Sequence, residues 1–401
     1  MNAVIYGAGN IGRGFIGTLF SGADYKITFI DAAENIVNAI NKIKAYPVKF
    51  VSNSESEEIM ITGITAINCV NENEAMDCIA KSDIIATAVG VRSLPSIAPV
   101  IAGGLRKRFR NNTVPLNIII CENLINADKY LAELIKNYLV ENEITQMKEQ
   151  VGFVETSIGR MVPLQTQDMQ EGNILRICTE RYAFLPVNKD AFKGSFPEIK
   201  GIVPFNNFNF FIQRKFFIHN MGHALCAYLG LLLGETYIAD AASRADILFI
   251  TQNAMIESAQ ALNKKFNADL QGIMDHIKDL IFRFNNRNLK DTCERVGADT
   301  ERKLGHQDRF MGAINCCIEQ GITPAFISIG AAAALHYHIK MNALAQTEEN
   351  AASILEIISK LEKNSDAAFL ILNMYNKILA GNTPNELLQY ALFSGNKQEI
   401  I

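Results

Sequence analysis

The sequence predicts an α/β protein with two domains: an N-terminal doubly wound parallel sheet and a mostly α-helical C-terminal domain. Three observations predict this fold. Short, nearly continuous apolar runs alternate with helical segments early in the chain, as in strands that are covered on both faces. A glycine-rich turn directly follows the first apolar run. Beyond Pro204 only Pro324 and Pro384 remain, which favours helices in the second half.

The first β-α-β unit runs from residue 3 to Asp31. A short apolar strand, AVIY at 3–6, leads into GAGNIG at 7–12, and the following RGFIGTLF has helical spacing. A second strand, KITFID, ends at Asp31, nineteen residues after Gly12. Strand, G-x-G-x-x-G, helix, strand and acid in this order are typical of a Rossmann-type dinucleotide-binding unit.

Each part of this motif has a physical role in binding a dinucleotide. Gly7 allows the tight turn, Gly9 lets the backbone approach a pyrophosphate, and Gly12 permits close helix–strand packing. Asn10 and Ile11 complete the loop, where the helix N-terminus faces the phosphates.

Asp31 predicts which dinucleotide is bound. A carboxylate at the end of the second strand can accept both ribose hydroxyls and would repel a 2′-phosphate. The sequence therefore predicts NAD, rather than NADP, as the cofactor.

Two later apolar runs, at 83–90 and 116–123, are predicted strands of the same sheet, with helices expected at 73–82 and 127–139. Ligands of such sheets bind beyond the carboxyl ends of the strands. Gly90, Glu122 and Asn123 fall there. Gly90 is a cofactor-binding candidate and Asn123 a catalytic candidate; a turn is the alternative role for Asn123.

The pattern changes near residue 195, which divides the expected domains into 1–195 and 196–401. An additional strand or pair of strands is expected within 173–186. Helical spacing then recurs, in the segments 239–264, 269–284, 308–319, 326–341 and 350–362.

The segment KFFIHNMGH at 215–223 places three polar residues in what otherwise resembles a buried helix. On a helical wheel Lys215, Asn220 and His223 fall at roughly 0°, 140° and 80°, on one side of the cylinder. A cation, an amide and an imidazole that converge in this way could bind and deprotonate a hydroxyl group. The alternative is a core helix with a snorkelling lysine and two satisfied polar residues.

Arg302, Lys303 and Arg309 lie in an unusually basic segment at 283–310 that glycine and asparagine interrupt. Such a loop could bind a phosphate through charge-assisted hydrogen bonds. A solvated charged face is the alternative.

Composition excludes several other classes of protein. A net charge of −4 and a pI near 6.0 argue against a nucleic-acid-binding protein. None of the eight cysteines forms a CxxC pair, so no metal site is expected. No signal peptide and no uncharged run long enough for a membrane helix are visible, which predicts a reduced, cytoplasmic protein without membrane partners. We expect a monomer or a weak homo-oligomer.

Several motifs together resemble the family of polyol-specific long-chain dehydrogenases, over most of the chain. The Lys-x4-Asn-x2-His element at 215–223 is the most selective of them, and the sugar-phosphate members of the family are the most similar. The matching segments are GAGNIGRGFIG at 7–17, TAVG at 87–90, CEN at 121–123, R-x-V-P at 160–163, RKFFIHNMGHA at 214–224, RFNNRNLKD at 283–291, ERVG at 294–297 and RKLGHQDR at 302–309.

The resemblance implies a role for each candidate residue. Lys215 becomes the general acid/base, Asn123 and Asn220 bind the oxygen that is oxidised, and His223 orients the substrate. No metal is used, and the active site is implied to lie between the two domains. The residues expected to bind substrate are Arg160, Arg302, Lys303 and Arg309.

The known chemistry of lysine and asparagine side chains is compatible with these implied roles. An unperturbed lysine, with a pKa near 10.4, is a poor base at neutral pH, but burial beside a positively charged nicotinamide would lower that pKa. Two asparagine amides can donate to the alkoxide-like oxygen of the transition state. The sequence departs from the family at Gly159, where an aspartate usually precedes the arginine of R-x-V-P; Glu155 is the nearest replacement.

The predicted function is an NAD-dependent dehydrogenase that interconverts D-mannitol 1-phosphate and D-fructose 6-phosphate. The alternatives are the same chemistry on an unphosphorylated polyol or a hexuronate and, more remotely, a non-catalytic NAD-binding regulator. The intact Lys215, Asn220 and His223 set argues against the regulator.

Overall fold

The computed structural model of the chain describes residues 1–111 and 114–394. The chain forms two compact units, Met1–Ile212 and Gln213–Ile401. The first unit continues past the expected boundary at residue 195, because strand β11 (Ile202–Phe205) pairs with β10 (Leu185–Asn188).

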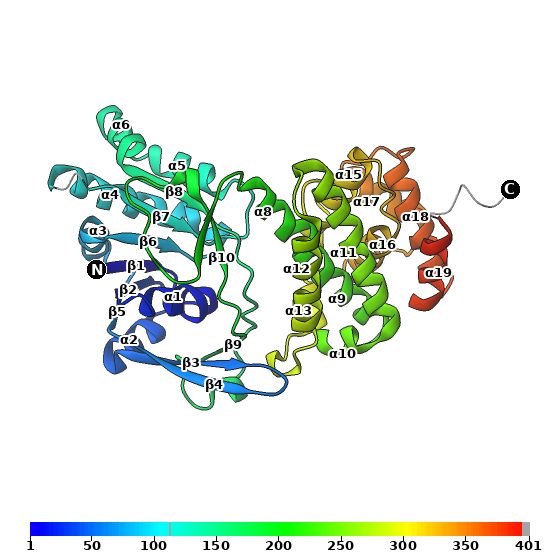
Figure 1. The fold of residues 1–401 in the computed structure, drawn as a ribbon, viewed down its shortest axis with the longest axis horizontal. Helices are drawn as coiled ribbons and strands as arrows, with labels where there is room; N and C mark the ends of the chain where they lie inside the picture. Colours follow the sequence, from blue (N-terminus) through cyan, green and yellow to red (C-terminus); the bar gives the residue numbers. More distant parts are fainter. Residues whose placement is uncertain (112–113, 395–401) are drawn as a thin grey trace. The chain divides into compact units, whose positions relative to one another are not determined.

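A six-stranded, fully parallel sheet organises the first unit (Figure 1). The predicted doubly wound sheet is therefore confirmed. In spatial order its strands are β5 (Ile64–Asn68), β2 (Lys26–Asp31), β1 (Asn2–Tyr6), β6 (Ile84–Thr87), β7 (Leu116–Ile120) and β8 (Val151–Glu155). The helices are α1 (Gly17–Ser21), α2 (Glu34–Ile43), α3 (Glu72–Lys81), α4 (Leu94–Asn111), α5 (Ala127–Lys136), α6 (Glu141–Gln150) and α7 (Gln167–Gln170), with short turns η1 (Gly12–Ile16), η2 (Val91–Ser93) and η3 (Lys189–Ala191).

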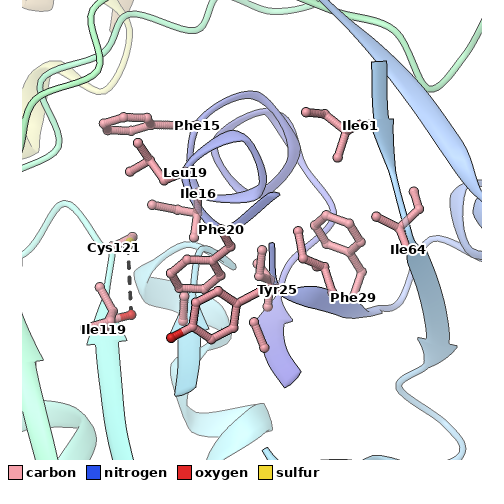
Figure 2. Close-up of a cluster of buried hydrophobic side chains, with 14 of the residues drawn as sticks. Phe15, Ile16, Leu19, Phe20, Tyr25, Phe29, Ile61, Ile64, Ile119 and Cys121 are labelled. Carbon is pink, nitrogen blue, oxygen red and sulfur yellow. Dashed lines mark hydrogen bonds between the residues drawn. The ribbon is translucent and has the colours of Figure 1, made fainter. Parts of the chain in front are cut away.

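Each face of the sheet carries its own hydrophobic core, because side chains alternate along a strand. On β1, Ala3 and Ile5 pack on the face covered by η1, α1 and α2, whereas Val4 and Tyr6 pack under α3 to α6. Figure 2 shows part of the first of these cores, where Phe20 of α1 packs against Tyr25. Helices on both faces account for the near-continuous apolar strands.

Two small sheets are added to the first core. Strand β3 (Ala45–Val51) pairs antiparallel with β4 (Ser56–Thr62) and parallel with β9 (Ile177–Thr179). Strands β9 and β10 are the additional strands expected within 173–186.

Asn41 on α2 closes the outer edge of β5. Its side-chain nitrogen donates to the Ala66 carbonyl at 2.8 Å, and its oxygen accepts from the Ala66 amide at 2.8 Å. The amide thus replaces a strand partner at Ala66, where an open edge would favour pairing with another chain.

The second unit is helical, as predicted. Its two central helices, α9 (Met221–Leu233) and α16 (Ala325–Met341), are buried on almost every side, as expected for apolar helices in a core. Gly330 permits their close approach, since a Cβ there would lie 2.7 Å from Leu225. The helices are α8 (Asn209–Arg214), which begins in the first unit, the π-turn η4 (Lys215–Asn220), α9 (Met221–Leu233), α10 (Ile238–Ser243), α11 (Ala245–Phe266), α12 (Leu270–Phe284), η5 (Arg287–Leu289), α13 (Cys293–Gly297), α14 (Thr300–Lys303), α15 (Arg309–Glu319), α16 (Ala325–Met341), α17 (Glu348–Ile357), α18 (Asp366–Leu379) and α19 (Pro384–Ser394).

One continuous helix, Asn209–Leu233, is long and apolar enough to cross a membrane by length and composition. Within its most apolar window, 72% is buried inside the protein. Such burial is typical of the core helix of a globular protein.

Glu257 on α11 caps α16 from outside that helix. Its two carboxylate oxygens accept from the amides of Phe326 and Ile327 at 2.9 and 3.0 Å. These are first-turn N–H groups, which have no partner within their own helix. Burial raises the pKa of Glu257 to about 8, although the hydrogen bonds from those amides act to lower it.

Glu257→Gln is expected to flatten the dependence of stability on pH. Because the folded-state pKa is raised from 4.5 to about 8, the contribution of this group is complete below the unfolded pKa and is lost as pH rises toward the folded one. Wild type should lose about 1.4 kcal/mol of unfolding free energy per pH unit in that window relative to the variant. Denaturant unfolding between pH 5 and 9 measures the slope, with exposed Glu133→Gln as control. Parallel curves for wild type and Glu257→Gln would contradict the assignment.

Candidate active site

The glycine loop between β1 and η1 has the geometry that the sequence predicts. Gly7 has a φ of +100°, and a Cβ there would lie 2.3 Å from the Ala88 carbonyl oxygen. A Cβ on Gly12 would lie 1.9 Å from the Gly7 carbonyl oxygen. Around the Cβ position of exposed Gly9, no atom of the described residues lies within 4 Å. Gly9 therefore offers the open backbone that a pyrophosphate needs.

Ala8, inside this loop, is held by two opposite charges. Its amide donates to Asp31 Oδ2 at 2.6 Å, and its carbonyl accepts from Arg13 Nε at 2.6 Å. Asp31 Oδ1 accepts a further hydrogen bond, from the Ala33 amide at 2.8 Å. The loop conformation is thus fixed without a ligand, and the Asp31 carboxylate lies beside it, as a ribose-binding acid requires.

Other predicted loop residues also have structural contacts. The Asn10 amide donates to the Pro163 carbonyl at 2.9 Å, and Ile11 packs against the core beneath the loop. These contacts tie the loop to R-x-V-P at 160–163. Cofactor contact by either residue stays a prediction.

Two buried arginines brace the turn η1. Arg13 Nη1 donates to the Leu175 carbonyl at 2.5 Å. Arg160 Nη1 donates to the Gly14 carbonyl at 2.8 Å and to Thr18 Oγ1 at 3.1 Å, and its guanidinium lies 4.5 Å from the Phe15 ring centroid. This environment favours a structural role for Arg160 over the expected substrate contact. Sequence reasoning missed Arg13, although it directly follows Gly12.

Gly159 lacks the aspartate of the family pattern, and the ring of Tyr182 occupies the adjoining space. A Cβ at Gly159 would lie 2.9 Å from that ring. Glu155 Oε1 accepts from the Ala127 amide at 3.2 Å, at the N-terminus of α5, and its role as a replacement for that aspartate stays a prediction. Burial, reinforced by Asp128, raises the pKa of Glu155 to about 7.

Asn123 is exposed just beyond the carboxyl end of β7. The residue before it, Glu122, is buried and accepts from the amides of Val89 and Gly90 at 3.0 and 2.9 Å. Gly90, with a φ of +86°, begins the turn after β6. The two predicted candidates, Gly90 and Asn123, are therefore linked through Glu122, which the sequence places at the same strand ends without a role of its own.

In the second unit, the predicted polar set lies on the buried helix that contains η4. Within residues 215–230, all of them described, only Lys215, Asn220 and His223 are not fully buried. A π-helical turn, closed by i→i+5 hydrogen bonds, spans Lys215 to Asn220 and replaces the regular helix that the sequence predicts. Residues five apart lie closer in angle on such a turn than on an α-helix, so Asn220 moves toward the Lys215 side.

His223 is oriented by neighbours on two sides. Its ring stacks on Phe284, with centroids 4.9 Å apart and planes at 15°, and Nε2 lies 3.3 Å from Asp291 Oδ2. Arg295 Nε and Nη2 donate to the two Asp291 oxygens at 2.5 and 2.7 Å. Burial alone would raise the pKa of Asp291, but its contacts with His223 and Arg295 outweigh this and lower it to about 2. Asp291 ends the RFNNRNLKD motif, a signal that could have identified it.

The predicted basic residues come together on α14 and the start of α15. Asp308 Oδ1 accepts from Arg309 Nε at 2.8 Å, and Oδ2 accepts from Arg302 Nη1 at 3.2 Å. Arg302 Nε also donates to Asp299 at 2.5 Å. Two acids thus offset most of the charge of the two arginines.

Lys303 and one Arg309 nitrogen remain available for an anion. Among the residues the structure describes, Lys303 forms no ion pair, although it is only 5% exposed. Burial, and secondarily the nearby arginines, lower the pKa of Lys303 to about 7. Within the same described residues, buried Arg309 Nη2 has no hydrogen-bond partner. Unsatisfied buried donors of this kind call for an explanation, and a bound anion provides one.

The basic segment is rigidly attached to its own unit. Tyr228 donates to the Gly297 carbonyl at 2.9 Å, Thr300 Oγ1 lies 2.7 Å from His338 Nδ1, and Ser359 donates to the Leu304 carbonyl at 2.8 Å. These contacts fix both sides of α14 before any ligand binds.

Comparison with known families decides the class of the protein. Residues 1–201 match the model of the mannitol dehydrogenase Rossmann domain, and residues 207–383 match that of the mannitol dehydrogenase C-terminal domain. The chain belongs to the mannitol dehydrogenase family. The predicted family and the class of NAD-dependent polyol dehydrogenase are confirmed at this level, whereas the individual site roles stay predictions.

Solved structures of similar fold span nearly the whole chain. Mannitol 2-dehydrogenase from Pseudomonas fluorescens, in ternary complex with NAD and D-mannitol, matches with a TM-score of 0.80 at 14% identity, over 98% of this chain and 94% of that one. Substrate-free D-sorbitol dehydrogenase matches with a TM-score of 0.78 at 13% identity, over 96% and 94%. At such identities these matches establish the fold.

Asp31→Ser is expected to change cofactor preference in this mannitol dehydrogenase family member. The variant loses a carboxylate that can accept two ribose hydroxyls and that would repel a 2′-phosphate. KM for NADH should rise about tenfold or more, while use of NADPH relative to NADH improves. Steady-state kinetics with both cofactors test this, with exposed Asp77→Ser as control. A wild type that uses NADPH as well as NADH would exclude the role.

Proposed function

We propose that this protein is a mannitol-1-phosphate 5-dehydrogenase, which interconverts D-mannitol 1-phosphate and D-fructose 6-phosphate with NAD. The observation that carries the proposal is the pair of Lys303 and Arg309. In the part of the chain that the structure describes, a buried ammonium has no acid partner and a nearby buried guanidinium nitrogen has no hydrogen-bond partner, a combination that suits a phosphate.

Lys215, Asn220 and His223 supply the proposed chemistry at the other end of the substrate. Bound NAD would supply the hydride acceptor. Lys215 takes the hydroxyl proton as the alcohol is oxidised and returns it on reduction. Asn220 and Asn123 are the proposed donors of N–H groups to the oxygen that becomes the carbonyl. His223, held by Phe284 and Asp291, contacts a neighbouring hydroxyl and sets the orientation of the sugar chain.

A second candidate, the same chemistry on a hexuronate or a free polyol, is favoured by the charge around the basic residues. Arg302, Lys303 and Arg309 face Asp299 and Asp308, which leaves one uncompensated positive charge. A carboxylate needs no more than that. The two similar structures carry the names of enzymes for unphosphorylated polyols, mannitol and sorbitol.

Lys215→Met is expected to remove turnover and to leave NADH binding intact. Methionine keeps the apolar stem that packs within the helix but cannot transfer a proton. Since positioned acid/base groups contribute about 10²–10⁴-fold, kcat should fall at least a hundredfold. Stopped-flow turnover and NADH fluorescence titration measure the two quantities separately. A variant that retains more than about a tenth of wild-type kcat would remove Lys215 from the mechanism.

Lys303→Met is expected to weaken binding of the phosphorylated substrate selectively. It tests the anion site better than Arg309→Ala, which would also remove one of the two arginine partners of the half-buried Asp308 carboxylate. Loss of one charge-assisted contact should raise KM for fructose 6-phosphate about tenfold or more, with little effect on free fructose. In wild type that KM should also rise above pH 7, as the Lys303 ammonium, with a pKa of about 7, loses its proton. Lys265→Met is the control. Equal losses on both sugars would show that Lys303 is structural.

A further inference from the structure

Glu122 forms a bridge between two neighbouring strand ends. Strands β6 and β7 are paired in parallel up to Thr87 and Ile120, and the Cys121 amide donates to the Thr87 carbonyl at 3.0 Å. Beyond this point, Glu122 Oε1 accepts from the Val89 amide at 3.0 Å and Oε2 from the Gly90 amide at 2.9 Å. One side chain thus continues the connection after backbone pairing has ended.

This bridge places a carboxylate in an unfavourable environment. Glu122 is only 6% exposed, and among the described residues it forms no ion pair. Burial raises the pKa of Glu122, and the two amides oppose that rise only in part. A buried charge without a cation is costly, and an apolar side chain would fill the same space at lower cost. A carboxylate suits this position because it provides one acceptor oxygen for each of two adjacent N–H groups.

The bridge fixes two functional segments at once. On one side it orients the peptide groups of Val89 and Gly90, and no described atom lies within 4 Å of the Cβ position of Gly90. On the other side it immediately precedes the exposed Asn123. Both segments lie at the carboxyl ends of adjacent parallel strands, where ligands of such sheets bind.

We infer that Glu122 is a positioning residue, which locks the Val89–Gly90 turn to the end of β7 and so holds Asn123 in its reactive geometry. The inference rests on the proposed role of Asn123. It goes beyond that role by making the orientation of the amide depend on a neighbouring carboxylate that is not itself expected to touch the substrate.

Glu122→Gln is the direct test, because glutamine keeps the shape but offers one acceptor oxygen and an NH₂ group that would face an amide N–H. With fructose 6-phosphate, or free fructose if wild type prefers it, kcat should fall about tenfold or more, since small displacements of a reacting group are costly. KM for the sugar should change less than kcat. Glu257→Gln is the matched control, a buried acid of the second unit whose two oxygens likewise accept from two adjacent backbone amides; its kcat should stay within about twofold of wild type.

A double-mutant cycle with Asn123→Ala separates positioning from general stability. If Glu122 acts through Asn123, the double variant should lose little more turnover than Asn123→Ala alone, whereas independent effects would multiply. A Glu122→Gln variant with a lowered Tm and a kcat within twofold of wild type would overturn the inference, as would multiplicative losses. If Glu122→Gln fails to fold, Glu122→Asp replaces it: the shorter acid cannot reach both amides, and full turnover would refute the bridge. Full turnover of Asn123→Ala itself would instead refute the proposed function.

Discussion

A helix buried on almost every side must satisfy each polar group that it carries, and this constraint governs the second unit. The helix Asn209–Leu233 lies in the core, yet Lys215, Asn220 and His223 keep partial exposure along it. The π-turn at Lys215–Asn220 brings the lysine and the asparagine closer in angle. Such turns are rare and occur frequently at functional sites. The surrounding helices, with Phe284 and Asp291 beside His223, support these three polar residues.

A second theme is the use of carboxylates to hold pairs of backbone amides. Asp31 binds the amides of Ala8 and Ala33, Glu122 those of Val89 and Gly90, and Glu257 those of Phe326 and Ile327. Two oxygens on one short side chain can accept from two N–H groups at once, which the single oxygen of an amide or hydroxyl side chain does less well. In the first unit this device fixes both turns that a dinucleotide would contact. The site is therefore preorganised by acids, although its expected ligands carry negative charge.

Local sequence patterns predicted the parts of the fold that depend on local physics. Strand β2 was predicted with its observed bounds, and the glycine loop has the expected geometry because steric limits at Gly7 and Gly12 leave few alternatives. Strands β3, β4 and β8 were not foreseen, since long-range pairing rather than periodicity defines them. The helix expected at 239–264 is divided at Arg244, where the backbone is extended.

The candidate site divides in the same way. Lys215 and Asp31 were identified from sequence because their residue types, within their motifs, indicate their chemistry. Arg13 and Asp291 were not identified, and Glu122 was placed at its strand end without a role, because their importance lies in the partners that folding brings to them. Arg160 shows the converse: it is a basic residue in a matching motif, and its guanidinium donates to the carbonyls of Gly14 and Tyr182 within the first unit.

The central claim, a dehydrogenase whose basic cluster selects a phosphorylated sugar, is tested most directly by substrate preference. Oxidation of NADH by the purified wild-type protein can be followed with fructose 6-phosphate, fructose and a keto-hexuronate in parallel. The account predicts that kcat/KM for fructose 6-phosphate exceeds both others by about tenfold or more, as expected for one additional charge-assisted contact. A higher kcat/KM for the hexuronate or for free fructose would contradict it.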